Sequence, residues 1–192
     1  FIPRPETEFV AQLAIDALRA VASEQPIAVD LGTGSGAIAL AMATEVGNSK
    51  IYAVEKSDDA ISFTRKNFAN CAPDNSVLIH GDLVGAFGEL DGTVSVVASN
   101  PPYIPLAAVP RDIEVRLHDP ELALYGGDDG MQVMHQVSAT AKRLLHTGGT
   151  LVVEHADSQS QQVSQLLLAD GWRQIRAHKD LTGRDRAVTA IK

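Results

Sequence analysis

The sequence predicts an α/β fold: a mostly parallel seven-stranded sheet, helices on both of its faces, and an antiparallel strand pair at the C-terminal end. Short apolar runs alternate along the chain with segments in which apolar residues recur at helical spacing. The last two strand-like runs, residues 172–177 and 186–191, follow one another with no helix between them. With 192 residues, 45% of them hydrophobic, the chain can bury a full core as one domain, residues 1–192.

The first half of the chain is expected to form three strands and three helices. A helix runs from Glu6 to about Ala22, because apolar residues recur there every three to four positions. The apolar runs 26–31, 50–54 and 77–79 have the length and composition of buried strands. Further helices are predicted over 37–44 and after Ser57, whose hydroxyl is placed to cap the helix.

The second half is expected to add four strands. Residues 94–98 form the fourth, and the polar, proline-containing stretch 104–129 after it is interpreted as a lid or substrate loop. A helix then begins near Met131 and is predicted to end at Gly148-Gly149. The strand 150–153, a helix over 158–169 and the two closing strands complete the chain.

A glycine-rich turn, Gly32-Thr33-Gly34-Ser35-Gly36, joins the first strand to the following helix. Glycine lets the backbone adopt positive φ and approach a ligand closely, and the helix N-terminus behind the turn faces that ligand. A glycine-rich turn alone is a weak signal. Between a strand and a helix it favours a nucleotide-like ligand over a plain turn.

Acidic residues at the strand ends narrow the choice of nucleotide. Glu55, followed by Lys56, is placed to accept from ribose hydroxyls, although a solvated strand end or the lead-in to a helix cap also explains it. Asp82 can accept from an adenine amino group while Leu83 packs on the ring, with a turn aspartate as the alternative. Asp30 would repel a pyrophosphate but attract an ammonium group. S-adenosylmethionine satisfies all these residues, whereas Asp30 and the glycine spacing disfavour a nicotinamide dinucleotide.

The run Asn100-Pro101-Pro102-Tyr103 follows the fourth strand, at the edge where open α/β sheets place ligands. Asn100 offers a carbonyl oxygen that accepts from an NH2 group, the prolines carry no competing N–H, and Tyr103 offers a ring face. A plain strand-to-loop exit explains these four residues about as well on their own. Together with the cofactor features they predict a catalytic pocket that methylates a planar NH2 group.

Three motifs stand out: Ile2-Pro3-Arg4-Pro5-Glu6-Thr7-Glu8, Asp30-Leu31-Gly32-Thr33-Gly34-Ser35-Gly36 and Asn100-Pro101-Pro102-Tyr103. With them the chain resembles, over nearly its whole length, the class I S-adenosylmethionine-dependent methyltransferases, which have a Rossmann-like fold, and more closely the HemK-type bacterial release factor glutamine methyltransferases. Residues 119–124, 126–130, 154–155 and 180–186 are also similar to that family. Leu83 departs from it, because some members have an aromatic residue there.

The resemblance implies a methyl transfer from S-adenosylmethionine, with S-adenosylhomocysteine as product. The acceptor it implies is the side-chain amide nitrogen of the glutamine in the Gly-Gly-Gln motif of peptide chain release factors. It implies that Asn100 to Tyr103 bind the amide, that Asn100 also contacts the cofactor, and that Arg4 and Glu6 help to bind the substrate. Since the family carries a helical domain ahead of this segment, we expect the chain to be a fragment.

Composition limits the partners, the cellular compartment and the metal sites that the sequence allows. The net charge of −8 disfavours nucleic acid as a partner. The single Cys71 fits a reducing compartment, and we expect a cytoplasmic monomer with no membrane segment. No histidine, cysteine and carboxylate cluster has metal-ligand spacing, and His155 is more often structural or solvent-facing than catalytic.

Three alternatives stay open. A nucleic-acid adenine-N6 methyltransferase would share the Asn-Pro-Pro-Tyr element, and a ribosomal-protein glutamine methyltransferase would share the chemistry. A non-catalytic adenosyl-ligand scaffold would need the glycine turn but neither Asn100 nor Tyr103.

Overall fold

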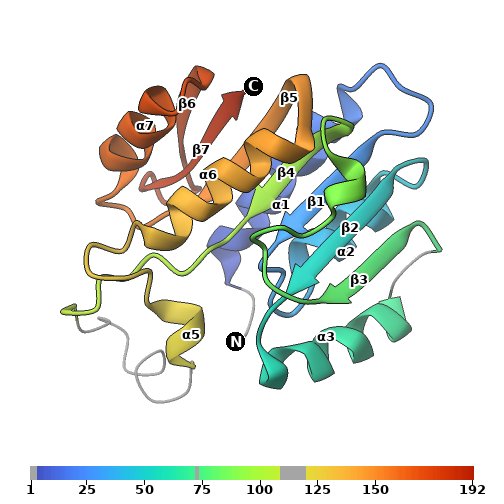
Figure 1. Ribbon diagram of the computed structural model, residues 1–192, viewed down its shortest axis with the longest axis horizontal. Coiled ribbons are helices and arrows are strands. Elements are labelled where there is room, and N and C mark those ends of the chain that lie inside the picture. Colours follow the sequence, from blue (N-terminus) through green and yellow to red (C-terminus); the bar gives the residue numbers. More distant parts are fainter. Residues whose placement is uncertain (1–3, 72–73, 109–119) are drawn as a thin grey trace.

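A seven-stranded sheet with the strand order β3-β2-β1-β4-β5-β7-β6 organises the computed structural model, which describes residues 4–71, 74–108 and 120–192 (Figure 1). The strands are β1 (Ile27–Leu31), β2 (Lys50–Glu55), β3 (Ser76–His80), β4 (Val94–Ser99), β5 (Leu145–Glu154), β6 (Arg173–Lys179) and β7 (Asp185–Ile191). The first five pair in parallel, whereas β7 is antiparallel to both β5 and β6. The predicted fold class is therefore confirmed.

Helices cover both faces of this sheet. They are α1 (Pro5–Arg19), α2 (Ala37–Glu45), α3 (Asp58–Cys71), α5 (Glu121–Leu124), α6 (Gln132–Leu144) and α7 (Ser160–Ala169), with a 3-10 turn at Gly88–Leu90. Helices α1 and α2 pack on one face, and α6 and α7 pack on the other, with α6 in front of the sheet in Figure 1. None of the helices within the described ranges is both long and apolar enough to cross a membrane.

The burial of each strand follows its place in the sheet. Every residue of the central strand β4 is buried, as its continuous apolar run predicts for a strand covered on both faces. Strand β6 lies at the sheet edge, and most of its side chains are exposed, including Arg173 and Lys179. Charged side chains on an edge strand hinder pairing with another chain.

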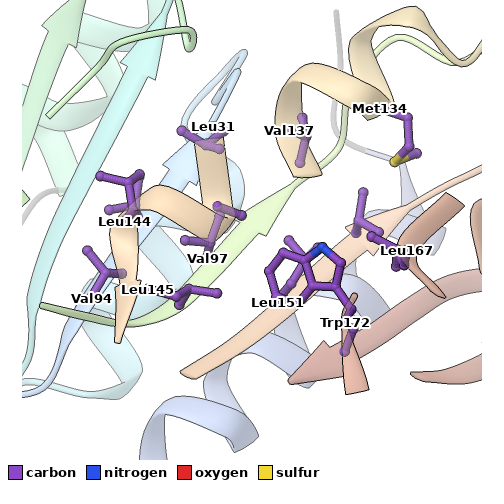
Figure 2. Packing of buried hydrophobic residues seen from close by; sticks show 14 of the residues in the cluster. Leu31, Val94, Val97, Met134, Val137, Leu144, Leu145, Leu151, Leu167 and Trp172 are labelled. Carbon is purple, nitrogen blue, oxygen red and sulfur yellow. The ribbon is translucent and has the colours of Figure 1, made fainter. Parts of the chain in front are cut away.

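The hydrophobic core on the α6 and α7 face of the sheet includes the buried Trp172 (Figure 2). Its ring lies among Leu151 and Leu167, and its indole N–H donates to the Ser138 hydroxyl at 2.9 Å. Burying an aliphatic side chain stabilises the fold by about 1.5–3 kcal/mol, so this layer fixes β4 and β5 beneath the site.

Two predicted element ends are wrong. Helix α1 ends at Arg19 rather than near Ala22, because the Val21 N–H bonds to the Leu18 carbonyl in a tighter turn. Helix α6 ends at Leu144, and Gly148-Gly149 lie inside β5. The glycines form an irregularity where β5 shifts its register against β4, and their backbone groups bond to Lys192.

The described parts of the stretch 104–129, residues 104–108 and 120–129, contain regular structure. They include α5, and Ile104 forms a parallel bridge with Tyr125. The part of the lid interpretation that falls on residues 109–119 lies outside the described residues, as do Phe1, Ile2 and Pro3.

Candidate active site

The carboxyl ends of the parallel strands open onto one cavity of about 1310 Å³. It is lined by every predicted site residue except Gly36, the last residue of the glycine turn, which lies against Phe68. These lining residues are Arg4, Glu6, Asp30, Gly32, Thr33, Gly34, Ser35, Glu55, Lys56, Asp82, Leu83, Asn100, Pro101, Pro102 and Tyr103. The structure thus brings together segments that are far apart in the sequence.

The glycine turn has the conformation that its sequence predicts. Gly32, Gly34 and Gly36 have φ values of 71°, 57° and 89°, in the left-handed region that favours glycine. A Cβ atom at Gly36 would also lie 2.8 Å from the Phe68 ring, whereas at Gly32 or Gly34 it would meet nothing within 4 Å. The turn therefore presents bare backbone to the cavity.

Asp30 lies beneath this turn and is almost fully buried. Its Oδ2 accepts hydrogen bonds from the Thr33 hydroxyl at 2.5 Å and the Ala39 N–H at 3.1 Å. Its Oδ1 is buried and has no hydrogen-bond partner among the described residues. Burial, helped by the nearby charge of Glu55, raises the pKa of Asp30 to about 7. A cation beside Oδ1 would offset this desolvation.

Glu55 organises the backbone around it. One carboxylate oxygen accepts from the Gly34 N–H and the other from the Ser57 N–H, both at 2.7 Å. Glu55 is buried, so a solvated strand end no longer explains it. Each oxygen keeps a second lone pair, which leaves the ribose role as a prediction.

Asp82 combines a turn role with a place on the cavity wall. It accepts from the Val84 N–H at 2.9 Å and forms an ion pair with Lys56 at 2.8 Å. The hydrogen bond from Lys56 is the main reason why the pKa of Asp82 lies below its usual value. Leu83 beside it packs against the core cluster of the α6 and α7 face.

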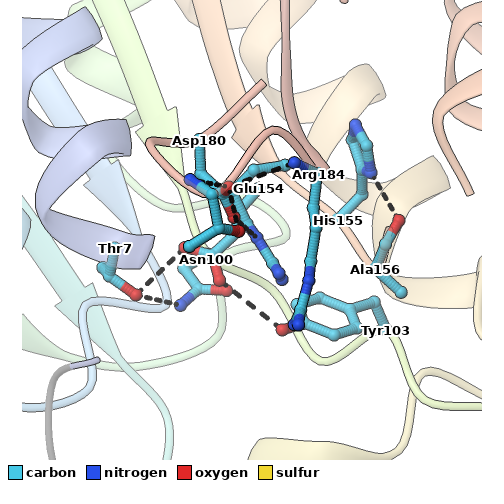
Figure 3. Close-up of polar contacts among 10 residues, drawn as sticks. Thr7, Asn100, Tyr103, Glu154, His155, Ala156, Asp180 and Arg184 are labelled. Carbon is cyan, nitrogen blue, oxygen red and sulfur yellow. Dashed lines mark hydrogen bonds and ion pairs between the residues drawn. The ribbon is translucent and has the colours of Figure 1, made fainter. Parts of the chain in front are cut away.

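Asn100 belongs to a hydrogen-bonded chain with Thr7 and Glu154 (Figure 3). The Asn100 NH2 group donates to the Thr7 hydroxyl at 3.2 Å, and that hydroxyl donates to Glu154 Oε2 at 3.0 Å. The Tyr103 hydroxyl lies 3.5 Å from Glu154 Oε1. Because its NH2 group is engaged, Asn100 has its carbonyl oxygen available for a ligand.

Glu154 and Thr7 lie in stretches that resemble the family, but sequence reasoning did not predict either as a site residue. Glu154 is 3% exposed, and burial raises its pKa to about 7, against the opposing effects of Thr7 and Arg186. The available signal was its position, because a polar residue that ends a buried parallel strand next to β4 lies at the same sheet edge as Asn100.

A glycine-rich segment supports the backbone of Pro102 and Tyr103 from behind. A Cβ atom at Gly126 would lie 2.5 Å from the Pro102 carbonyl oxygen, and one at Gly130 would collide with the Tyr103 carbonyl oxygen. The Gln159 side chain donates to that same Tyr103 carbonyl at 2.9 Å. Residues 126–130 thus lie behind the pocket wall, and among them Asp129 lines the cavity.

Replacing Gly130 by alanine is expected to lower the turnover of any methyl transfer at this site by about 10-fold or more, because Tyr103 must shift. Gly148→Ala is the matched control, since Gly148 also has a positive φ (88°) but open space around it. Gly148→Ala should lower the free energy of unfolding by about 1–2 kcal/mol through backbone strain and leave turnover unchanged. Equal losses of turnover in the two variants would contradict a supporting role for Gly130.

Charged residues around the start of α1 and around the β6–β7 turn complete the wall. Arg4, just ahead of α1, and Glu6 of α1 line the cavity, as do Arg184 in the turn and Arg186 of β7. Asp180 holds this turn, accepting from Thr182 and Arg184 and lying 3.4 Å from the Arg186 Nε. These hydrogen bonds, that of the Thr182 hydroxyl above all, lower the pKa of Asp180 to about 2.

His155 does not join the site. It is fully buried, and its Nδ1 lies 2.7 Å from the Ala156 carbonyl oxygen, on the side away from Asn100 (Figure 3). Burial lowers its pKa, so the ring stays neutral. The structural interpretation of His155 holds, and the solvent-facing one is wrong.

Comparisons with known proteins show the family to which this chain belongs. Residues 7–118 match the family model of the methyltransferase small domain. The release factor glutamine methyltransferase of Streptomyces coelicolor is 50% identical over 197 residues, which cover 100% of this chain and 68% of that protein. The 4-amino-L-phenylalanine/4-methylamino-L-phenylalanine methyltransferase of Streptomyces pristinaespiralis is 36% identical, covering 100% of this chain and 65% of that protein.

A solved structure extends the similarity to three dimensions. The release factor-specific protein-(glutamine-N5) methyltransferase from Alicyclobacillus acidocaldarius is 26% identical to this chain and has a TM-score of 0.59, with 100% of this chain and 94% of that chain covered. The identity over the full chain, the family model and the shared fold lead to one conclusion. The chain belongs to the release factor glutamine methyltransferase family.

Proposed function

We propose that this protein transfers a methyl group from S-adenosylmethionine to the side-chain amide nitrogen of the glutamine in the Gly-Gly-Gln motif of peptide chain release factors. The observation that carries the proposal is the orientation of Asn100. Its NH2 group donates to Thr7, so its carbonyl oxygen is the group offered to a substrate. An acceptor oxygen suits a substrate that brings an NH2 group. The single Cys71 supports a cytoplasmic setting.

The residues around the cavity fit S-adenosylmethionine. The buried Asp30 Oδ1 has no partner among the described residues and suits an ammonium group. Gly32 and Gly34 leave open space above their backbone, Glu55 keeps lone pairs for ribose hydroxyls, and Leu83 offers an apolar surface beside Asp82. When bound, S-adenosylmethionine supplies an electrophilic methyl group on its sulfonium.

The pocket compensates for a weak nucleophile. An amide nitrogen reacts poorly because its lone pair is delocalised into the carbonyl group. We expect Asn100 Oδ1 and the Pro101 backbone carbonyl to accept its two hydrogens, which shifts electron density toward the nitrogen and fixes its position. Pro102 carries no N–H that could compete for these oxygens. The half-buried Tyr103 ring lines the cavity and would cover the amide plane, and the product can release its proton afterwards without a dedicated base.

Methyl transfer from labelled S-adenosylmethionine to competing acceptors tests this proposal. The acceptors are a class I release factor, ribosomal proteins, duplex DNA and 4-amino-L-phenylalanine, each at the same concentration. A release factor with glutamate in place of the Gly-Gly-Gln glutamine is the matched control. We expect label in the release factor and none in its control.

Each other outcome contradicts the proposal in its own way. Preferential labelling of DNA, ribosomal proteins or the arylamine would reassign the acceptor. Cofactor binding with no label in any acceptor would favour a non-catalytic adenosyl-ligand scaffold.

A further inference from the structure

The hydrogen-bonded chain behind Asn100 has a direction that follows from its chemistry. An ionised carboxylate can only accept, so the Thr7 hydroxyl must give its single hydrogen to Glu154 Oε2, 3.0 Å away. The Thr7 oxygen can then only accept from its other neighbour, the Asn100 side chain at 3.2 Å. The Asn100 amide is therefore held with its NH2 group toward Thr7.

We infer that Thr7 and Glu154 are positioning residues for the proposed reaction, which set the orientation of the Asn100 amide through this chain. The inference rests on the proposed function and deepens it. Neither Thr7 nor Glu154 needs to touch the substrate that receives the methyl group. Their effect is to present the Asn100 oxygen, rather than the Asn100 NH2 group, to that substrate. Thr7 is 93 residues away from Asn100 in the sequence and 147 residues away from Glu154. Folding therefore brings the three hydrogen-bonded residues together at the sheet edge.

Protonation of Glu154 on Oε2 would reverse the direction. The carboxyl group would then donate to Thr7, and the Thr7 hydroxyl would be free to donate to the Asn100 oxygen. An Asn100 amide flipped in this way would point its NH2 group at the NH2 group of the substrate. An NH2 group only donates, so Asn100 could not accept a hydrogen bond from the substrate. The ionised form of Glu154 is thus the active form, and turnover should fall as the pH drops through its pKa.

Several charged and titratable groups face Glu154 and Tyr103, and they decide where this transition lies. They are Glu6 of α1, Tyr103 after β4 and Arg186 of β7 around Glu154, with Arg4 ahead of α1 near Tyr103. Burial and Glu6 raise the pKa of Glu154, and Thr7, Arg186 and Tyr103 lower it, which leaves it at about 7. The transition is therefore expected close to neutral pH.

Substitutions at Thr7 separate the hydroxyl from the shape of the side chain. Thr7→Val should lower kcat by about 10-fold, with an unchanged cofactor Kd, whereas Thr7→Ser should stay within about threefold of wild type. Thr140→Val, which removes a hydroxyl from a buried threonine of α6, is the matched control and should change neither value. A Thr7→Val enzyme with wild-type kcat, or a Thr7→Ser enzyme as impaired as Thr7→Val, would overturn the inference.

The pH dependence of kcat tests Glu154. Wild-type kcat should fall as the pH drops through about 7. Glu154→Gln keeps an oxygen that accepts from Thr7 but does not titrate, so its kcat at saturating cofactor should be flat between about pH 6 and about pH 8. Saturation matters because the pKa of Asp30 is also about 7, and a bound ammonium group would keep Asp30 ionised across this range. An acidic limb that persists unchanged in Glu154→Gln would contradict the role of Glu154.

A spectroscopic measurement makes the test independent of methyl transfer. The side-chain NH2 signals of Asn100 in ¹⁵N-labelled protein, assigned by their loss in Asn100→Asp, should shift with an apparent pKa of about 7. The shift should vanish in Glu154→Gln and in Thr7→Val. A pH-independent Asn100 signal in the wild type would overturn the inference even if release factor methylation is found. A titrating signal without methylation would defeat the proposed function alone.

Discussion

Replacing Asn100 by alanine is expected to lower kcat by about 100-fold or more. The lost interaction is with the reacting amide of the substrate, and it strengthens as electron density moves onto the nitrogen. Cofactor affinity should change by less than about threefold, because Asp30, Glu55 and the glycine turn keep their hydrogen bonds. Single-turnover rates and a cofactor Kd from calorimetry measure the two effects separately.

The control for this variant is another asparagine outside the cavity. Asn48 is exposed and donates to the Glu24 carbonyl, so Asn48→Ala should leave both kcat and the cofactor Kd unchanged. Near-normal turnover of Asn100→Ala would refute the assigned role. A large rise in its cofactor Kd with unchanged kcat would move Asn100 from the reaction to cofactor binding.

Replacing Glu55 by alanine is expected to raise the cofactor Kd by about 30-fold or more, with a smaller effect on kcat at saturation. Two causes combine: the Gly34 and Ser57 N–H groups lose their acceptor, and the ribose hydroxyls lose theirs. Hydrogen bonds to a charged group are worth about 1.5–3 kcal/mol each, so one lost contact raises Kd by about 10- to 150-fold, a range that includes the expected change. Equilibrium binding of the cofactor measures it directly.

Glu89→Ala is the control for Glu55, because Glu89 is exposed and lies outside the cavity. It should bind the cofactor as the wild type does. An unchanged Kd for Glu55→Ala would show that neither the turn geometry nor a ribose contact depends on this carboxylate.

Much of the fold and part of the site followed from local patterns. The buried strands were predictable because parallel strands covered on both faces are continuous apolar runs, as β4 shows. Asn100 and Glu55 were predictable because each ends such a strand, and the ends of parallel strands share one edge. The positive φ values of Gly32, Gly34 and Gly36 likewise follow from a tight strand-to-helix turn.

The rest depends on contacts between distant segments. Nothing in the run around Gly130 indicates that it packs against the Tyr103 carbonyl, and Thr7 looks like an ordinary residue of a first helical turn. Gly148-Gly149 was misassigned because a pair of glycines after apolar helical spacing resembles a helix end. Its place in β5 is instead set by pairing with β4 and the chain end.

The most direct test of the account is to locate the methyl group in the product by tandem mass spectrometry of a release factor incubated with the protein and S-adenosylmethionine. The account predicts a single added methyl on the side-chain amide nitrogen of the Gly-Gly-Gln glutamine, and about 100-fold less product, or lower, when Asn100→Ala replaces the wild type over the same time. A methyl group on another residue, or an equal yield from Asn100→Ala, would contradict it.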